Sequence, residues 1–280
     1  FGILLPVGGA AEEPITVRGI VFDDLNKNDA RDPGEPGLAK IRVSNGSEVA
    51  QTDGTGQYEL TIDASDAMVF VIKPRGYLSP LNKHNLPQFH YVHKPQGSPP
   101  ELKYKGVAPT GPLPPSVDFP LRKRPEPDEF KVVMFGDPQP NNLGDIDHMA
   151  NDVIGELIGT DAAFGMALGD LMADLLDLYE PYNQVMAQLG IPMWNVPGNH
   201  DLNMDVRKDA LSTETWNRIF GPTTYAFDYG PVHFIVLDNI LWRGNTYGVG
   251  FDEKTLKFVE NDLKHVPKDQ LVVIAMHAPL

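Results

Sequence analysis

The fold of this chain is decided by residues 192–201, which read PMWNVPGNHD. The first half is a short, mostly apolar run of the kind that forms a buried strand, and Gly198-Asn199-His200-Asp201 follows it directly as a polar turn. The same succession of apolar run and polar residues recurs at Asp137-Pro138-Gln139, at Gly169-Asp170 and at Met276-His277. This repetition predicts strands whose carboxyl ends meet at one edge of an α/β fold, where such folds gather ligands.

Six polar side chains follow these strands, and all are of kinds that bind divalent metals. They are Asp137, Gln139, Asp170, Asn199, His200 and His277. Two cations about 3.5 to 4 Å apart can deprotonate a bridging water near neutral pH and neutralise a phosphoryl group. Such a pair needs a bridging carboxylate, and Asp170 is placed for that role. Singly, each Asp or Asn would be interpreted as a helix cap or turn former, but their joint placement predicts a metallohydrolase.

The composition sets the limits of this interpretation. A length of 280 residues predicts about two domains, and 41% hydrophobic residues allow a sizeable core. Lys and Arg number 23 against 38 Asp and Glu, so the formal net charge is -15. This charge argues against a nucleic-acid backbone as the main partner and attracts cations. The absence of Cys excludes disulfides, zinc–thiolate sites and cysteine nucleophiles, and no apolar run reaches transmembrane length.

The first residues bear on localisation. Residues 1–11, FGILLPVGGAA, are apolar and then small, like the end of a secretory signal peptide with its cleavage site. They predict a secreted or periplasmic protein, although the positively charged start of such a peptide is missing. The alternative is a disordered apolar terminus, and in both cases we assign residues 1–13 to a segment outside the folded domains.

Residues 14–123 predict a small all-β domain. Short strands alternate there with clusters of Gly, Asn and Asp, which is the spacing expected of a β-sandwich. The expected strands cover residues 15–22, 40–43, 57–62 and 68–72. Proline is frequent from residue 95 to residue 127, where it suppresses helices and central strands, and residues 116–121 are expected to return as an edge strand. We place the domain boundary near residues 124–128.

Residues 128–280 change to alternating strands and helices, which predicts an α/β domain. The expected strands cover residues 131–135, 163–168, 192–196 and 271–275, with a hairpin of 225–229 and 232–238. The expected helices run from a capping Asp145 to Leu157, from about residue 178 to 189 with Gly190 closing it, and from 254 to 265. His233 alternates within a strand and is interpreted as structural.

Residues 130–280 resemble a calcineurin-like metallophosphoesterase. The signature of that family runs Asp-x-His, Gly-Asp, Gly-Asn-His-Asp or -Glu, a lone His and then Gly-His-x-His, and this chain supplies the four segments named above. The resemblance implies layered sheets and helices that hold two divalent metal ions, Mn, Mg, Zn or Fe, sharing Asp170. By the same resemblance, Asp137 and Gln139 bind the first metal, while Asn199 and His277 bind the second.

The resemblance also implies catalytic roles for His200 and Asp201. His200 would protonate the leaving oxygen of a phosphoester, and Asp201 would fix the tautomer of His200. Gln139 stands where the family has His, so a neutral amide oxygen favours Mn²⁺ or Mg²⁺ on that side. The Gly-His-x-His element does not occur up to Leu280. We expect a phosphoesterase domain that is incomplete at its carboxyl end, the alternative being a degenerate domain.

Residues 22–35, FDDLNKNDARDPGE, resemble the calcium loops of β-sandwich repeats in bacterial surface proteins. The domain around them also resembles the small immunoglobulin-like or prealbumin-like sandwich that precedes some bacterial calcineurin-like enzymes. Positions 1, 3, 5, 9 and 12 of a calcium loop are occupied by Asp24, Asn26, Asn28, Asp32 and Glu35. Asp29 stands where Gly is usual, and Asp tolerates the left-handed conformation better than most residues. The alternative is an Asp- and Asn-rich turn without calcium.

Together these observations predict a secreted or periplasmic bacterial phosphoesterase with a β-sandwich in front of it. The rival prediction is a non-catalytic surface or binding protein with a degenerate phosphoesterase domain, which Gln139 favours and the intact Gly-Asn-His-Asp element opposes. A metal-dependent nuclease would use the same site but is disfavoured by the net charge. The expected partner is a phosphoester substrate. Its identity, the choice between monoester and diester, and the oligomeric state have no readable pattern in the sequence.

Overall fold

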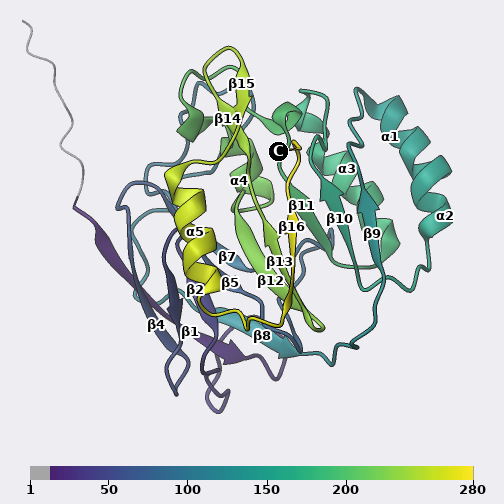
Figure 1. Cartoon of the computed structure of the whole chain (residues 1–280). Helices are drawn as coiled ribbons and strands as arrows, with labels where there is room; N and C mark the ends of the chain where they lie inside the picture. Colours follow the sequence, from purple (N-terminus) through teal and green to yellow (C-terminus); the bar gives the residue numbers. More distant parts are fainter. Residues whose placement is uncertain (1–12, 280) are drawn as a thin grey trace, which may run out of the picture.

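The N-terminal region is a β-sandwich in the computed structural model, which describes residues 13–279. The predicted signal-peptide remnant, apart from Glu13, lies outside the described residues. Two four-stranded sheets, ordered β4-β1-β8-β6 and β3-β2-β5-β7, build this region, and its mostly β character confirms the expectation (Figure 1). The strands are β1 (Ile15–Asp23), β2 (Arg42–Ser44), β3 (Val49–Gln51), β4 (Gln57–Ile62), β5 (Ala67–Ile72), β6 (Tyr77–Leu78), β7 (His90–His93) and β8 (Phe119–Lys123).

Alternation along the strands explains why the sandwich forms. In β4 the side chains of Tyr58, Leu60 and Ile62 are buried while their neighbours face solvent, so one face of the strand supplies the core. Residues 119–121, within the edge strand predicted at residues 116–121, pair with β1 alone, as an edge does, although β8 as a whole lies between β1 and β6. Pro120 has no N–H to donate, and it is tolerated there because pairing with β6 begins only at Arg122.

The second half of the chain contains two three-stranded sheets and five α-helices among the described residues. Its strands are β9 (Val132–Phe135), β10 (Phe164–Leu168), β11 (Met193–Val196), β12 (Tyr225–Tyr229), β13 (Val232–Val236), β14 (Ile240–Trp242), β15 (Tyr247–Val249) and β16 (Leu271–Ala275). Its helices are α1 (Leu143–Met149), α2 (Gly155–Leu157), α3 (Tyr179–Met186), α4 (Glu214–Ile219) and α5 (Glu253–Leu263). The first sheet is parallel, ordered β11-β10-β9; the second, β12-β13-β16, has β16 parallel to β13. The pattern did not indicate α4, β14 or β15.

The first helix begins differently from the expectation. Its N-cap is Asn142, whose side chain accepts a hydrogen bond from the backbone N–H of Asp145, so Asp145 is not the cap. After Met149 the chain widens into a π-helical turn over residues 150–154 before α2 begins. The helix α3 passes into a 3₁₀ turn over Ala187–Leu189, and Gly190 closes this turn in the left-handed conformation, at the position where the sequence predicted the helix to end.

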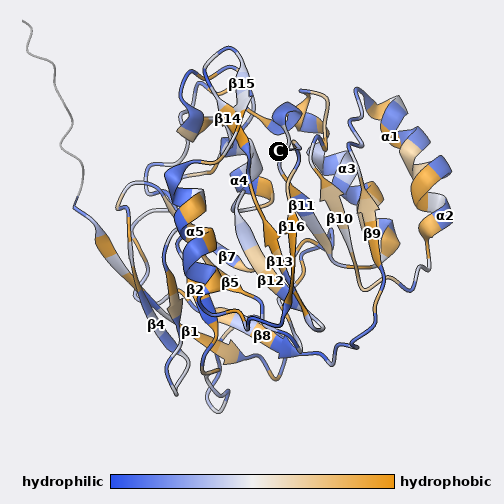
Figure 2. Ribbon diagram, viewed as in Figure 1, coloured by the Kyte–Doolittle hydropathy of each residue, from blue (hydrophilic) through white to orange (hydrophobic). Residues whose placement is uncertain are grey.

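The two three-stranded sheets pack face to face through aromatic side chains. Trp194 of β11 stacks on Phe227 of β12 with ring centroids 4.1 Å apart. Phe164 of β10 meets Phe234 of β13 edge to face at 5.3 Å. The opposite face of β10 and β11 is covered by α1 and α3, with Ile146 among the residues of that second core. Figure 2 shows the hydrophobic residues concentrated on these central strands.

The β-sandwich and the second half share one continuous core. A single cluster of buried side chains runs from Val43 and Phe70 in the sandwich to Phe227 and Phe258 in the second half. Phe70 meets Phe258 of α5 at 5.7 Å between ring centroids, and Lys73 pairs with Phe227 as an isolated parallel bridge. The two halves are therefore packed together across an apolar interface.

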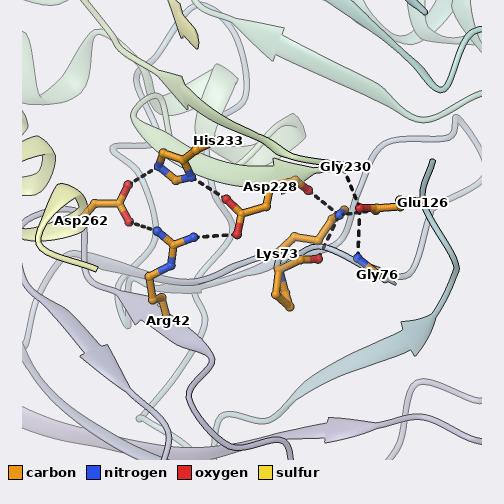
Figure 3. Close-up of polar contacts among 9 residues, drawn as sticks. Arg42, Lys73, Gly76, Glu126, Asp228, Gly230, His233 and Asp262 are labelled. Atoms are coloured by element: carbon orange, nitrogen blue, oxygen red, sulfur yellow. Dashed lines mark hydrogen bonds and ion pairs between the residues drawn. The ribbon is translucent and has the colours of Figure 1, made fainter. Parts of the chain in front are cut away.

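A buried ionic network crosses the same interface (Figure 3). The guanidinium of Arg42 in β2 contacts Asp228 and Asp262, each at 2.8 Å. The imidazole of His233 lies between the same two carboxylates, 2.6 Å from each. Beside it, Lys73 binds Glu126 at 2.7 Å and donates to the backbone carbonyl of Asp228. Since a buried charge is costly unless it is paired, these contacts fix how the sandwich sits on the second half.

No helix among residues 13–279 has the length and apolar character needed to span a bilayer.

Candidate functional site

The predicted site residues that follow β10, β11 and β16 come together at the carboxyl ends of those strands. Asp170 and Asn199 follow neighbouring parallel strands, β10 and β11. His277 follows β16 of the facing sheet, and its Nε2 atom lies 3.3 Å from Asp170 Oδ2 and 3.3 Å from Asn199 Oδ1. The two sheets therefore contribute to one site.

Asp170 is the centre of this site. Its Oδ2 atom accepts a hydrogen bond from the Gln139 side-chain amide at 3.2 Å. The backbone N–H of Gln139 also donates to the Asp170 carbonyl, at 2.9 Å. On the other side, Asp170 Oδ1 accepts from the backbone N–H of His200 at 2.9 Å, and the His200 Nε2 atom lies 4.0 Å from Oδ2. Asp137 lies exposed at the end of β9.

Close backbone approach requires two of the glycines. A Cβ atom at Gly169 would lie 2.3 Å from the ring of His277, and one at Gly198 would lie 2.2 Å from the backbone nitrogen of Asp170. Asp137, Gln139 and Asp170 themselves have positive φ values of 55°, 42° and 50°. Non-glycine residues in this region carry strain, which proteins concentrate at functional sites. These turns are therefore held in an unfavourable conformation, which in Gln139 and Asp170 brings the two side chains together.

The charges of Asp170 and His277 support each other. Burial opposes ionisation of Asp170, but the hydrogen bond from His277 and the backbone N–H of His200 outweigh it, so its pKa lies below the ordinary value. For His277, the hydrogen bond to Asp170 raises the pKa to about 9, and the charges of Asp170 and Asp137 add to this effect. The other ring nitrogen of His277 lies 2.9 Å from the Leu168 carbonyl. The contact with Asp170 thus favours the protonated form of His277.

The partner of His200 is Asp174. The Nδ1 atom of His200 lies 2.6 Å from Asp174 Oδ1, so the ring is oriented by a carboxylate four residues beyond Asp170. The prediction that Asp201 fixes the tautomer is wrong. The 3₁₀ turn over 199–201 directs Asp201 inward, where it accepts hydrogen bonds from backbone N–H groups of Gly198 and Leu171.

The hydrogen bonds of Asp201 indicate that it stabilises the turn rather than orienting His200. Its carboxylate also accepts from the Tyr179 hydroxyl at 2.9 Å. Burial raises its pKa to about 7 in spite of these donors. In the sequence, the Gly-Asp-x-x-x-Asp spacing of residues 169–174 already singles out Asp174, whose position four residues after Asp170 predicts a supporting residue or a helix cap rather than a metal ligand.

The predicted metal ligands contact one another in this structure. Among residues 13–279, no group of three or more carboxylates and imidazoles converges in a geometry that would hold a metal ion. Gln139 and His277 instead lie against Asp170, and Asn199 lies against His277. The donor chemistry nevertheless suits hard divalent cations, because it consists of carboxylates, amides and imidazole. Metal binding by Asp137, Gln139, Asp170, Asn199 and His277 remains a prediction.

The predicted calcium loop is closed by its own hydrogen bonds. Asp32 Oδ2 accepts from the side-chain amides of Asn26 and Asn28, at 2.7 and 2.8 Å. The buried Glu35 accepts from the backbone N–H of Asp32, at 2.9 Å. The carboxylate of Asp24 is paired with the Arg122 guanidinium at 2.9 Å. Asp29 has a φ of 63°, as the loop position requires. The predicted ligands thus share one turn, and calcium binding there stays a prediction.

Comparison with known families bears on the N-terminal region. No curated protein matches the chain. Residues 25–108 match the family model described as the N terminal of calcineurin-like phosphoesterase. This region contains β2 to β7 and the loop after β1, so the match is independent of the four segments at the candidate site. Residues 25–108 therefore match the N-terminal region of this family, which supports the calcineurin-like metallophosphoesterase with an N-terminal domain recognised in the sequence.

Proposed function

We propose that this protein is a metal-dependent phosphoester hydrolase whose site is centred on Asp170. The observation that carries the proposal is the gathering of Gln139, His200 and His277 around one Asp170 carboxylate oxygen, at 3.2 to 4.0 Å. Asp137, Gln139, Asp170, Asn199 and His277 would hold two divalent cations, with Mn²⁺ or Mg²⁺ favoured beside the amide of Gln139. The two facing sheets with α1 and α3 outside them would then be the layered phosphoesterase fold.

The residues of the site have distinct parts in this reaction. Bound at these ligands, two cations would supply a nucleophile from water at neutral pH and neutralise the phosphoryl charge. His277 must lose its proton to become a ligand, since only neutral imidazole binds metal. His200 presents Nε2 to the site because Asp174 holds Nδ1. In its protonated form His200 is therefore placed to protonate the leaving oxygen.

The rival function is that of a non-catalytic surface or binding protein whose phosphoesterase domain is degenerate. The absence of a converged cluster of three carboxylates and imidazoles among residues 13–279 favours this alternative. The positive φ values of Asp137, Gln139 and Asp170 favour the enzyme, because a scaffold alone does not need a strained site. The net charge of -15 makes a nuclease the weaker enzymatic choice.

Two further proposals concern context. We infer from the apolar and small residues at 1–11 that the protein acts outside the cytoplasm, in the manner of secreted or periplasmic bacterial hydrolases. We also infer that its substrate is a small phosphoester, because the strongly negative chain repels polyanions.

The test is hydrolysis of phenyl phosphate and diphenyl phosphate, whose leaving groups are basic enough to need protonation, by the full-length protein stripped of metal and reloaded with Mn²⁺. His200→Ala should lower kcat by roughly 10²- to 10⁴-fold if His200 is the general acid. The matched control is His148→Ala, which removes an imidazole exposed on α1 and should have no effect. Equal activity of wild type and His200→Ala would rule out His200 as the general acid, and a wild type without activity on either ester would favour the binding-protein alternative.

A further inference from the structure

A segment of the N-terminal region reaches the candidate site. Residues 103–105, which follow the sandwich strand β7 in the chain, are hydrogen-bonded to the second half in succession. The backbone N–H of Lys103 donates to Asp205 at 2.8 Å, and the carbonyl of Lys105 accepts from Arg218 at 2.9 Å. Between them, the side chain of Tyr104 is buried in the core that covers β10. This segment therefore belongs structurally to the second half.

The hydroxyl of Tyr104 ends beside the residue that orients His200. It donates a hydrogen bond to the backbone carbonyl of Asp174 at 2.8 Å. Asp174 is a non-glycine residue with a φ of 64°, a conformation that persists only where the surroundings hold it. Immediately before it, the N–H of Ala173 donates to the carbonyl of Pro140 at 3.2 Å. The peptide of Asp174 is thus held by Tyr104 on one side and by the turn after β9 on the other.

We propose that Tyr104 is a positioning residue for His200, acting through Asp174. The chain of contacts is short: the Tyr104 hydroxyl fixes the Asp174 backbone, and the Asp174 carboxylate fixes His200 Nδ1 at 2.6 Å. The Asp174 side chain is half exposed, so its direction depends on its backbone more than on packing around it. The inference rests on the proposed function, and it gives the N-terminal region a part in the reaction.

This role predicts a specific kinetic signature. His200 is proposed to protonate the leaving oxygen, and protonation matters more for a basic leaving group than for an acidic one. Removing the Tyr104 hydroxyl should therefore slow esters of phenol or alkyl alcohols more than nitrophenyl esters. A tyrosine that only stabilised the fold would slow all esters equally, because it would change the amount of active protein.

The experiment compares Tyr104→Phe with Tyr182→Phe in the full-length, Mn²⁺-loaded protein. Tyr182 is the matched control, because its hydroxyl is buried in the same core without a hydrogen-bond partner among the described residues. For phenyl phosphate, Tyr104→Phe should lower kcat roughly 3- to 10-fold, the loss expected from one hydrogen bond. The KM of Tyr104→Phe for phenyl phosphate should be unchanged, and its kcat for p-nitrophenyl phosphate should fall only slightly. Tyr182→Phe should behave as wild type with both esters.

The outcomes separate this proposal from the proposed function. A wild type without activity on any ester would overturn the proposed function. An active wild type with Tyr104→Phe slowed equally on all esters, or not slowed, would overturn the positioning role alone. A measurement that does not depend on activity is the low-field proton NMR signal of His200 Nδ1–H. This signal is assigned by its loss in His200→Ala and in Asp174→Asn. Tyr104→Phe should shift or broaden this signal, and an unchanged signal would count against the proposal.

Discussion

The molecule contains two clusters of histidine and carboxylate side chains that differ in burial and in the number of carboxylates paired with the imidazole. At the interface between the halves, His233 is completely buried, and each of its ring nitrogens lies 2.6 Å from a carboxylate. At the candidate site, His277 is partly exposed and has one carboxylate, Asp170, at 3.3 Å, while its other ring nitrogen faces a backbone carbonyl. We call the His233 cluster closed, because both ring nitrogens are paired with carboxylates. We call the His277 cluster open, because its imidazole has a single carboxylate partner and is partly exposed.

Charge balance explains what each cluster can do. At the interface, the cations Arg42 and His233 face the anions Asp228 and Asp262, so the network is neutral when His233 is protonated. Burial opposes this protonation, but the two hydrogen bonds outweigh it and raise the pKa of His233. The candidate site has three carboxylates, at residues 137, 170 and 174, with His200 and His277 as its imidazoles. Because its carboxylates outnumber its imidazoles, the candidate site attracts cations, whereas the interface cluster is balanced by its own Arg42 and His233.

The largest expected effect is at Asp170. Asp170→Asn removes the carboxylate that both cations would share, and it should abolish Mn²⁺ binding in calorimetry and turnover together. The amide oxygen of Asn can still accept the backbone N–H of His200, so the melting temperature should change little. Asp147→Asn on the exposed face of α1 is the control. Mn²⁺ binding by Asp170→Asn with wild-type affinity would show that the open cluster is not a metal site.

The next effect concerns the closed cluster. Arg42→Met leaves two buried carboxylates with only His233, and it should lower the free energy of unfolding by about 3 to 5 kcal/mol. Arg18→Met is the control, because Arg18 pairs with Glu59 at the surface and such pairs contribute about 0 to 1 kcal/mol. Urea unfolding measures both variants. Equal stability of the two would mean that the interface network does not hold the halves together.

The predicted calcium loop is a third cluster of carboxylates in this molecule. If Asp24 and its neighbours bind Ca²⁺, the ion must displace Arg122 from Asp24. Affinities of extracellular modules are around 10⁻⁴ to 10⁻³ M, so about 10 mM Ca²⁺ should stabilise the protein by roughly 1 to 3 kcal/mol. Calorimetric melting measures this gain, which Asp32→Asn should remove and Asp53→Asn should not. Identical melting with Ca²⁺ and with chelator would make the loop purely structural.

The smallest effect is a pH dependence of stability. Because the folded-state pKa of His233 is raised, the stability it contributes is fully present below its unfolded pKa of about 6.5. That stability is lost as pH rises through the folded-state value. Urea unfolding between pH 6 and pH 9 should show this decline, and His233→Gln should flatten it relative to the exposed control His265→Gln. Parallel curves for the two variants would contradict a protonated His233.

Local patterns predicted the strand ends well. The apolar runs before residues 137, 170, 199 and 277 became β9, β10, β11 and β16 with bounds shifted by at most two residues. Such runs are readable because a buried strand needs apolar side chains and a turn needs polar ones. The close backbone approach at Gly198, which admits no Cβ atom beside Asp170, was seen only in the structure.

The features that sequence reasoning missed depend on contacts between distant residues. Asp201 was given the role of Asp174 because the direction of a side chain after a 3₁₀ turn cannot be read from spacing. Arg42 and Asp262 meet across 220 positions of chain, and neither has a local pattern that indicates a partner. The edge character of residues 119–121 was readable from Pro120, which cannot donate, whereas the pairing of Arg122 and Lys123 with β6 has no local signal.

The shared core has a consequence for how related proteins could exchange parts. A sandwich transplanted from a relative would have to bring a cation opposite Asp228 and Asp262 and an aromatic ring opposite Phe258, because both are met from the sandwich side. It would also have to bring a tyrosine that reaches Asp174. Chimeras made by joining halves near residues 124–128 should therefore succeed only when these three contacts are carried together, so the two halves should evolve as one unit of selection.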